Sequence, residues 1–597
     1  MIHIHPIYTP TRSHPLLLKS LFPSKSTMYN CNGSTRPKLL YITIPISAIL
    51  LLTLIFSPKT NTHNPHLHFH KQYYQIAHSA CQGSLYPKLC VSTVASFPDL
   101  ISKSLPQIIS LTVNHTMSEV RASSANCTFI ERRFMRGTTT IQKRALDDCV
   151  ELLDDTVSEL EAALSDLTSK KSASSHYNDL QTLLSGALTN QGTCLDGLNI
   201  TKQPNSVLKN YVQNRIVTIS NHVSNILAML KKIPAGKHGH FTTTSSDQED
   251  EIFPEYGHVI NGFPTWVSSQ DQTLLVAPVN ESKIDLIVAK DGTGNFTTVA
   301  EAVAVAPNSS DTRFVIYIKA GAYLENVEVV KKKTNLMFLG DGIGKTVIKG
   351  SRNHVDGWTT FRSATVAVVG SGFIAKGITF ENSAGPSKHQ AVALRSGSDL
   401  SAFYLCSFVG YQDTLYAHSL RQFYRECDIY GTVDFVFGNA AVVFQNCNLY
   451  ARKPNENQRN MFTAQGREDP NQNTGISILN CKLAAAADLV PVRSNFKTYL
   501  GRPWKEYSRT VIMKSYIDES VEPVGWLEWN GTFALSTLYY GEYMNRGPGS
   551  NTSARVTWPG YRVINSSVEA SKFTVGAFIQ GLEWLNFTKV PYFSTLG

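Results

Sequence analysis

The sequence of 597 residues predicts a multidomain protein in which an all-α helical bundle precedes an all-β parallel β-helix. Three observations predict this order: helical spacing of apolar residues up to about residue 232, short β-branched and aromatic segments from about residue 283, and a repeat of about twenty residues among those segments. The chain is too long for one compact core. With 42% hydrophobic and 17% charged residues, a largely disordered chain is excluded.

The N-terminal region contains an uncharged segment long enough to cross a bilayer. This segment, residues 39–58, reads "LLYITIPISAILLLTLIFSP" and follows the cations Arg36 and Lys38. Length and flanking charge favour a transmembrane signal anchor with a cytoplasmic tail, residues 1–38, and with the rest of the chain in the secretory lumen. The alternative is a buried core helix. The anchor makes the membrane an expected partner.

Nine of the ten cysteines, all but Cys31, follow the predicted anchor and therefore enter an oxidising compartment. The spacing suggests that Cys81 and Cys90 close a small loop and that Cys149 and Cys194 join two helices, with Cys127 left over. Glycosylation sequons agree with a secreted glycoprotein; they include Asn114, Asn126, Asn199, Asn295, Asn530, Asn551 and Asn586.

Apolar residues between about 75 and 232 recur at intervals of three and four, as in amphipathic helices. One such series is Leu146, Cys149, Leu153, Val157, Leu160, Leu164 and Leu167, and a later one is Val212, Ile216, Ile219, Val223, Ile226 and Leu230. Several helices of this kind predict an antiparallel bundle over residues 75–232. The polar stretch "PAGKHGHFTTTSSDQEDE" from Pro234 then loses this period, which predicts a linker over residues 233–282.

Residues 283–597 contain an internal repeat that predicts the kind of β domain. The words "CSF", "CDI", "CNL" and "CKL" begin at Cys406, Cys427, Cys447 and Cys481, at intervals of 21, 20 and 34 residues. A period near twenty is typical of stacked coils in a parallel β-helix, whereas a sandwich shows hairpins every ~8–12 residues.

The same repeat places two acids at equivalent positions. Asp413 lies seven residues after Cys406, and Asp434 lies seven residues after Cys427. Neighbouring coils are ~4.8 Å apart, so the two carboxylates are expected in one small site. Two such close groups cannot both ionise easily, which leaves one as a nucleophile and the other as a proton donor. The alternative is that an aspartate before Thr414 only stabilises its own turn.

Several long motifs resemble those of plant pectin methylesterases. They are "GAYLENVEV" from Gly321, "TTFRSATVAVVG" from Thr359, "HQAVALRSGSDLSAFY" from His389, "GYQDTLYAHSLRQFYRECDIYGTVDFVFGNA" from Gly410 and "YLGRPWKEYSRTV" from Tyr499. The resemblance implies a right-handed parallel β-helix, residues 283–597, that demethylesterifies cell-wall homogalacturonan to pectate and methanol. It implies the cell wall as destination, a chemistry without metal or cofactor, and no nucleic-acid partner.

Carried over to this sequence, the resemblance implies a role for each of five polar residues. Asp434 is the expected nucleophile, and Asp413 is the expected general acid and then base. Gln390 and Gln412 are expected to donate to the oxyanion, where one donor is worth ~3 kcal/mol. Arg502, in "GRPW", is expected to bind Asp434 through its planar fork; the alternative for such an arginine is a structural ion pair.

The resemblance also implies a set of residues that bind the polymer. Aromatic rings can pack against the apolar faces of sugars, although aromatics in a β domain are more often part of the core. The expected substrate-binding residues are Phe361, Gln390, Tyr416, Phe437, Tyr499, Arg502, Trp504 and Trp529.

The helical half resembles the pectin methylesterase inhibitor domain, through "CQGSLYPKLC" at Cys81, "ALDDCVEL" at Ala145 and "TCLDG" at Thr193. This resemblance implies a four-helix bundle that contacts the enzyme domain in the same chain and restrains it until a processing protease cuts between them. Related enzymes carry basic residues for cleavage after a segment like the "FPTW" at Phe263. Here Gln272 and Thr273 stand where a basic pair is expected, so an uncleaved chain is an open alternative.

Two other functions fit the same features. Two carboxylates about 5 Å apart also suit a retaining glycosidase, so a β-helical glycosidase or lyase on the same polymer is one alternative. The second is a non-catalytic protein whose helical domain binds other esterases. A separate proteinaceous inhibitor is a further expected partner of the enzyme domain.

Overall fold

The computed structural model describes residues 65–134, 139–170, 172–199, 207–234, 259–260, 263–264 and 284–597. The expected cytoplasmic tail (1–38), the expected anchor (39–58) and most of the expected linker (233–282) lie outside these residues and stay predictions. Within the described part of the chain, no helix is long and apolar enough to cross a membrane. The strands β1 (Val259–Ile260) and β2 (Phe263–Pro264) form a small antiparallel pair in the linker region.

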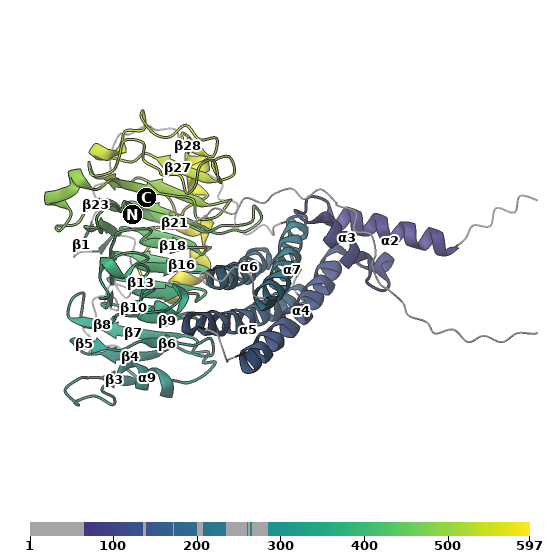
Figure 1. Ribbon diagram of the computed structural model, residues 1–597, viewed down its shortest axis with the longest axis horizontal. Helices are drawn as coiled ribbons and strands as arrows, with labels where there is room; N and C mark the ends of the chain where they lie inside the picture. The colour runs from purple at the N-terminus through teal and green to yellow at the C-terminus, as the bar shows by residue number, and fades with distance from the viewer. Residues whose placement is uncertain are drawn as a thin grey trace, which may run out of the picture. The chain divides into compact units, whose positions relative to one another are not determined.

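The helical domain consists of long antiparallel helices preceded by two shorter ones (Figure 1). Helix α5 packs against α4 and α6, and α7 packs against α4 and α6. The apolar stripe predicted for α5 is buried at Leu146, Leu153 and Leu160. Thr139 and Gln142 form a reciprocal capping box that begins α5. The helices are α2 (Pro65–Cys81), α3 (Pro87–Ala95), α4 (Leu105–Phe134), α5 (Thr140–Thr168), α6 (Tyr177–Asn199) and α7 (Val207–Leu230).

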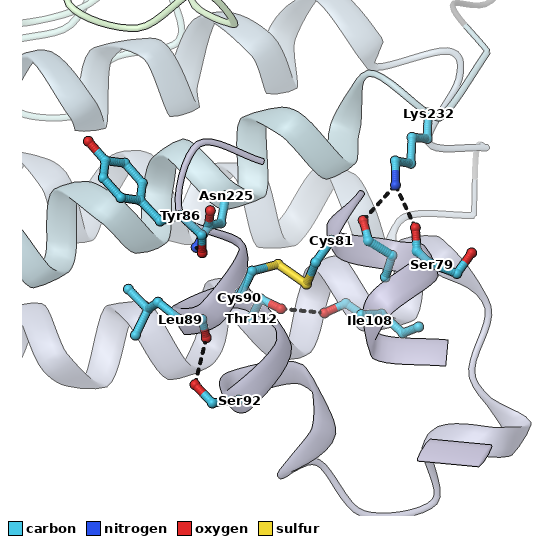
Figure 2. Close-up of a disulfide and its surroundings, with 11 residues drawn as sticks. Ser79, Cys81, Tyr86, Leu89, Cys90, Ser92, Ile108, Thr112, Asn225 and Lys232 are labelled. Atoms are coloured by element: carbon cyan, nitrogen blue, oxygen red, sulfur yellow. Dashed lines mark hydrogen bonds between the residues drawn. A yellow bond between two sulfur atoms is a disulfide. The ribbon is translucent and has the colours of Figure 1, made fainter. Parts of the chain in front are cut away.

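Two disulfides stabilise the helical domain, and both predicted pairings are confirmed. Cys81–Cys90 links the end of α2 to α3, and Cys149–Cys194 links α5 to α6. Cys127 is a free, buried thiol. Close to the first disulfide, the Lys232 ammonium group donates to the carbonyl oxygens of Ser79 and Ala80, at 2.6 and 2.9 Å (Figure 2). These contacts hold α2 against the end of α7.

The second half of the described chain is a parallel β-helix, as predicted, in which each coil from β4 to β24 adds one strand to each of three sheets. Figure 1 shows the strands stacked along the helix axis. The largest sheet contains β3 (Leu286–Val288), β4 (Phe314–Ile318), β7 (Leu336–Gly340), β10 (Ile374–Lys376), β13 (Ser401–Tyr404), β16 (Arg421–Arg425), β19 (Ala441–Gln445), β22 (Gly475–Leu479), β25 (Arg509–Met513), β27 (Tyr539–Tyr543) and β28 (Tyr561–Val563).

The other two sheets are shorter, and within each all pairings are parallel. One contains β5 (Gly321–Leu324), β8 (Thr346–Gly350), β11 (Thr379–Asn382), β14 (Ser407–Val409), β17 (Asp428–Gly431), β20 (Asn448–Ala451), β23 (Lys482–Ala485) and β26 (Tyr516–Ile517). The other, which carries the candidate site, contains β6 (Val327–Val329), β9 (Val366–Val368), β12 (Leu394–Ser396), β15 (Leu415–Ala417), β18 (Val436–Gly438), β21 (Asn460–Gln465) and β24 (Thr498–Gly501).

The cysteine repeat marks one corner of each coil. Cys406, Cys427, Cys447 and Cys481 directly precede β14, β17, β20 and β23, and all four are buried. The residue before each cysteine has a positive φ; these residues are Leu405, Glu426, Asn446 and Asn480. A corner that needs left-handed backbone in every coil explains why the repeat has a constant local pattern.

Interior side chains of successive coils stack on one another. The rings of Phe403 and Tyr424 lie 4.7 Å apart between centroids, and so do those of Tyr424 and Phe444. Helix α9 (Val299–Val305) packs near the first coils. The short helices α10 (Ser567–Ser571), α11 (Val575–Phe578) and α12 (Gly581–Trp584) follow the last strand. Dense stacking of this kind makes a rigid support for side chains at the coil surface.

Candidate active site

The repeat brings Asp413 and Asp434 to the same position on neighbouring coils. Each lies two residues before a strand of the third sheet, and Leu415 of β15 pairs in register with Val436 of β18. Both aspartates have left-handed backbone, with φ of 61° and 52°. The Asp413 N–H donates to the carbonyl of Val433 at 3.0 Å. Strained backbone that the surrounding coils hold in place is common at functional sites.

Arg502 holds the Asp434 carboxylate with two hydrogen bonds. Its Nε donates to Oδ1 at 2.8 Å and its Nη2 donates to Oδ2 at 2.6 Å. Burial is the largest single effect and lowers the pKa of Arg502, but the charge of Asp434, the hydrogen bonds to it and the charge of Asp413 together outweigh burial, so the net pKa is raised. The Trp529 ring lies 4.3 Å from the guanidinium carbon. This bidentate pair favours the charged carboxylate and fixes its orientation.

Asp413 is the other member of the pair and has a different electrostatic environment. Burial raises its pKa well above the usual value of an aspartate, and the charge of Asp434 raises it further, while Arg502 opposes both effects. Arg502 therefore forms its ion pair with Asp434, and the raised pKa of Asp413 favours its protonated form. One carboxylate and one carboxylic acid side by side can attack an electrophile and protonate a leaving group.

Gln390 and Gln412 are half-buried and lie in adjacent chain segments, since the Ala391 N–H donates to the carbonyl of Gln412 at 3.2 Å. Among the described residues, neither carboxamide has a hydrogen-bond partner. Both are therefore free to donate to a bound group. Their role at an oxyanion stays a prediction.

The structure brings most of the predicted aromatic residues together. Tyr416 and Phe437 are in register on β15 and β18, and their rings stack at 4.2 Å. Trp504 lies edge-on to Phe437 at 5.9 Å. Tyr499 is the exception, since it packs with Val433, Met461 and Leu527 in a separate apolar cluster. Its membership of a different cluster from the stacked pair is the reason to separate its role from theirs.

The helical bundle covers this site through one stripe of α6, which the sequence reasoning missed. The stripe consists of small polar residues at helical spacing, namely Thr182, Ser185, Thr189, Thr193 and Asp196. Thr193 Oγ1 lies 2.9 Å from Nε2 of the buried His418, and Asp196 accepts from Lys505 at 2.7 Å. The amide of Asn439 donates to Thr189 at 2.9 Å. The spacing of the stripe was visible in the sequence, but its partners were not.

The cleft aromatics belong to the hydrophobic core of the bundle. Phe361, Tyr416 and Phe437 are 4%, 3% and 4% exposed and pack in one cluster with the bundle's leucines. A small pocket, lined among others by Asp196 and Glu468, lies between α6 and the β-helix. The described chain is therefore in a closed state, with the expected sugar-binding surface occupied.

Fold and site together define a protein of the parallel β-helix class with a pair of adjacent carboxyl groups and a helical domain packed against its cleft. Comparison with known proteins is more specific. The pectinesterase family matches residues 285–582, and the plant invertase/pectin methylesterase inhibitor family matches residues 75–229. The chain belongs to the pectinesterase family and has an inhibitor-family domain in front of its enzyme domain.

Individual relatives have the same two-part organisation in their names. The chain is 54% identical to a probable pectinesterase/pectinesterase inhibitor 39 of Arabidopsis thaliana, over 82% of this chain and 90% of the relative. It is 46% identical to pectinesterase/pectinesterase inhibitor U1 of Solanum lycopersicum, over 93% and 97%. Among solved structures, pectin methylesterase from carrot is 61% identical with a TM-score of 0.52, covering 52% of this chain and 98% of the carrot chain.

Proposed function

We propose that this chain removes methyl groups from methyl-esterified homogalacturonan, with Asp434 as nucleophile and Asp413 as acid and base. The observation that carries the proposal is the asymmetry of the pair: Arg502 binds both oxygens of Asp434, while Asp413 beside it has a raised pKa. An ester carbonyl needs an anionic nucleophile and a proton for the departing alkoxide. The pair supplies one of each.

In the first half of the reaction, Asp434 attacks the carbonyl carbon of a galacturonate methyl ester. A tetrahedral oxyanion forms, to which Gln390 and Gln412 donate. When it collapses, the carbon–oxygen bond to the methoxy group breaks and Asp413 transfers its proton to that oxygen, which releases methanol. An acyl-enzyme anhydride on Asp434 remains.

In the second half, Asp413 is a carboxylate and takes a proton from water. The hydroxide attacks the acyl carbon, the bond to Asp434 breaks, and the polymer leaves with a free carboxyl group. Asp413 is protonated again and Asp434 is again an anion bound by Arg502. The net reaction consumes one water for each methanol, so neither metal nor cofactor is needed.

The two alternatives from the sequence are not favoured by the comparisons. Both the family match and the named relatives are pectinesterases, which argues against a glycosidase or lyase. The inhibitor-family domain and the enzyme domain are present in one chain, which argues against a protein that only inhibits others.

We further propose that the bundle inhibits the enzyme domain of the same chain. The burial of Phe361, Tyr416 and Phe437 against the bundle supports this, because a polymer needs these rings to be exposed. Opening requires cleavage or dissociation of the bundle. The site where cleavage is expected, with Gln272 and Thr273, lies outside the described residues.

We propose secretion to the cell wall as the destination. The two disulfides in the helical domain support an oxidising compartment. The predicted anchor would tether the chain to the membrane until it is removed, and a fractionation experiment that separates wall from membrane protein would distinguish the two states.

Methanol release from methyl-esterified pectin by residues 284–597, compared with the Asp434→Asn variant, tests the proposed function. The solved carrot chain is covered to 98% by 52% of this chain, which supports testing the β-helix by itself. We expect Asp434→Asn to abolish turnover with an unchanged circular dichroism spectrum. Equal methanol release by the two proteins would refute the assignment, and new chain ends without methanol would support a glycosidase or lyase.

A further inference from the structure

Charge is distributed with one sign on each side of the contact between bundle and β-helix. In every ion pair that the described residues form across this contact, the carboxylate belongs to the bundle and the cation to the β-helix. The cations are Lys331, Arg362, Arg395, Arg421 and Lys505, and the carboxylates are Asp148, Glu151, Asp155, Glu159, Asp179 and Asp196. The covered face of the enzyme domain is therefore suited to an anion.

Most arginines of this face also have an acidic partner in their own domain. Arg421 donates to both oxygens of Asp399, at 3.1 and 2.7 Å. Arg362 lies 3.7 Å from Glu328. These two side chains keep a counter-ion when the bundle leaves, which is the arrangement expected of a structural ion pair.

Arg395 differs, because no carboxylate among the described residues of the β-helix lies within ion-pair distance of it. Its side chain is only 3% exposed, and its one ionic contact is with Glu151 of the bundle, at 3.5 Å. Its Nε is buried without a hydrogen-bond partner. A buried cation with an unused donor is unfavourable unless an anion binds it.

The position of Arg395 connects it to the cleft. Arg395 of β12 is in register with Tyr416 of β15, which is in register with Phe437 of β18. It is thus one coil, ~4.8 Å, from the stacked aromatic pair. Its guanidinium carbon lies 3.4 Å from the centroid of the Phe361 ring, so the group is held flat against an aromatic surface.

We propose that Arg395 and Phe361 form a subsite for a free carboxylate of the polymer, and that Glu151 occupies this subsite in the closed chain as a mimic of that carboxylate. The inference rests on the proposed function, since it names the chemical class of one bound sugar unit. A methyl-esterified unit has no charge, whereas each turnover produces a carboxylate, which a guanidinium binds through two donors. The enzyme domain then prefers chains with a de-esterified unit next to the reacting one.

Binding of polygalacturonate, the fully de-esterified polymer, to residues 284–597 tests the subsite without requiring turnover. We expect Arg395→Gln to weaken the affinity about tenfold, measured calorimetrically at fixed ionic strength. The matched control is Lys331→Gln, which removes another cation of the same face. Lys331 pairs with two bundle acids, Asp155 and Glu159, and does not lie against an aromatic ring as Arg395 does. The affinity of this variant for polygalacturonate should stay within about twofold of that of the parent. Equal losses of affinity in the two variants would mean that the polymer is attracted by the overall positive charge of the face, and this result would overturn the proposal.

Kinetics give a second measurement. The ratio of kcat/KM on half-esterified to that on fully esterified pectin should fall about tenfold in Arg395→Gln, and by less in Arg395→Lys, which keeps the charge and serves if the glutamine variant is unstable. An unchanged ratio in both variants would overturn the subsite. The two proposals fail in different experiments. If the proposed function is wrong, Asp434→Asn still releases methanol. If only the subsite is wrong, Arg395→Gln binds polygalacturonate as well as the parent does.

The mimicry itself is tested in the full chain. Glu151→Gln should raise methanol release at least threefold, because the anion that occupies the subsite is lost. Because Glu151 also pairs with Arg362 at 2.7 Å, the matched control is Asp179→Asn, which removes a bundle acid of the same contact whose partner Arg421 keeps Asp399; it should raise activity less than Glu151→Gln. If Glu151→Gln leaves the full chain as inactive as its parent, Glu151 is not a mimic.

Discussion

The β-helix and the helical bundle both bury carboxyl groups, but they balance the charge differently. Asp413 lies beside the ion pair of Asp434 with Arg502 and forms no ion pair of its own among the described residues. By contrast, Asp148 pairs with Arg362, and Asp196 pairs with Lys505, each across the domain contact. Burial and the charge of Asp434 raise the pKa of Asp413 and favour the protonated form that can donate, whereas each ion pair across the contact joins the two domains. Whether a buried acid has an ion-pair partner therefore distinguishes the proton donor of the catalytic pair from the acids of the contact.

The largest effect is expected from removing the proton donor of the catalytic pair. Asp413→Asn in residues 284–597 should lower kcat for methanol release about 10³-fold, because asparagine can neither donate nor accept the catalytic proton. Asp428→Asn, whose carboxylate accepts from Asn448 on the next coil, is the control and should keep nearly full activity. If kcat falls by less than tenfold in Asp413→Asn, the assignment of Asp413 as the proton donor is contradicted.

The next effect concerns how each domain is held together. Replacing Cys149 and Cys194 by serine removes a cross-link over 45 residues and should lower the free energy of unfolding of the bundle by about 2–4 kcal/mol. Calorimetry of the full chain should show the bundle transition at a lower temperature and the β-helix transition unmoved. Cys127→Ser, which removes only a free buried thiol, should have the smaller effect; equal shifts would contradict the prediction.

A smaller effect is expected from one added methyl group at the contact. A Cβ on Gly192 of α6 would lie 2.6 Å from Oε1 of the half-buried Glu468, whereas one on Gly197 of the same helix would meet only Ala145 at an ordinary 3.8 Å. Both changes to alanine improve helix propensity by a similar ~1 kcal/mol. The Glu468 carboxylate is the end of a flexible side chain and can move, so Gly192→Ala should raise methanol release by the full chain only about threefold, and Gly197→Ala should not raise it. Equal activity in the two variants would show that α6 does not close the site.

The smallest effect is a gradual dependence of closure on pH. Burial, as the largest cause, raises the pKa of Asp148 to about 6 and that of Glu159 to about 7, although Arg362 and Lys331 oppose it. The negative charge of Glu151 raises the pKa of Asp148 further, and that of Asp155 raises the pKa of Glu159 further. In the open state both acids return to water and to their ordinary pKa values. The closed state therefore binds more protons, so closure is favoured by acid and weakens as the pH rises through about 6 to 7.

The measurement for this prediction is the activity of the full chain divided by that of residues 284–597, at each pH from 5 to 8. The ratio should rise with pH by a few-fold, and Asp148→Asn should flatten the rise because one titrating group is gone. A ratio that falls with pH would contradict the assigned direction.

Much of the fold and of the catalytic pair was predictable because both follow from short repeats. The left-handed corner before each of Cys406 and Cys427 repeats in every coil, so residues seven positions later had to align. The α5 stripe predicted one buried face in the same way. The contact of Thr193 with His418 was not predictable, because the two residues are 225 positions apart and neither belongs to the other's repeat.

The sequence by itself determined the two domains, the winding of the second, and the alignment of Asp413 with Asp434, because each depends on backbone geometry that recurs at a fixed spacing. The pairing of Arg502 with Asp434 was already expected from the resemblance of the motifs. Only the tertiary structure decided that Tyr499 packs apart from the stacked aromatic pair and that Arg395 meets Glu151. Those outcomes depend on which long side chains from distant segments reach one another, and no local spacing encodes that.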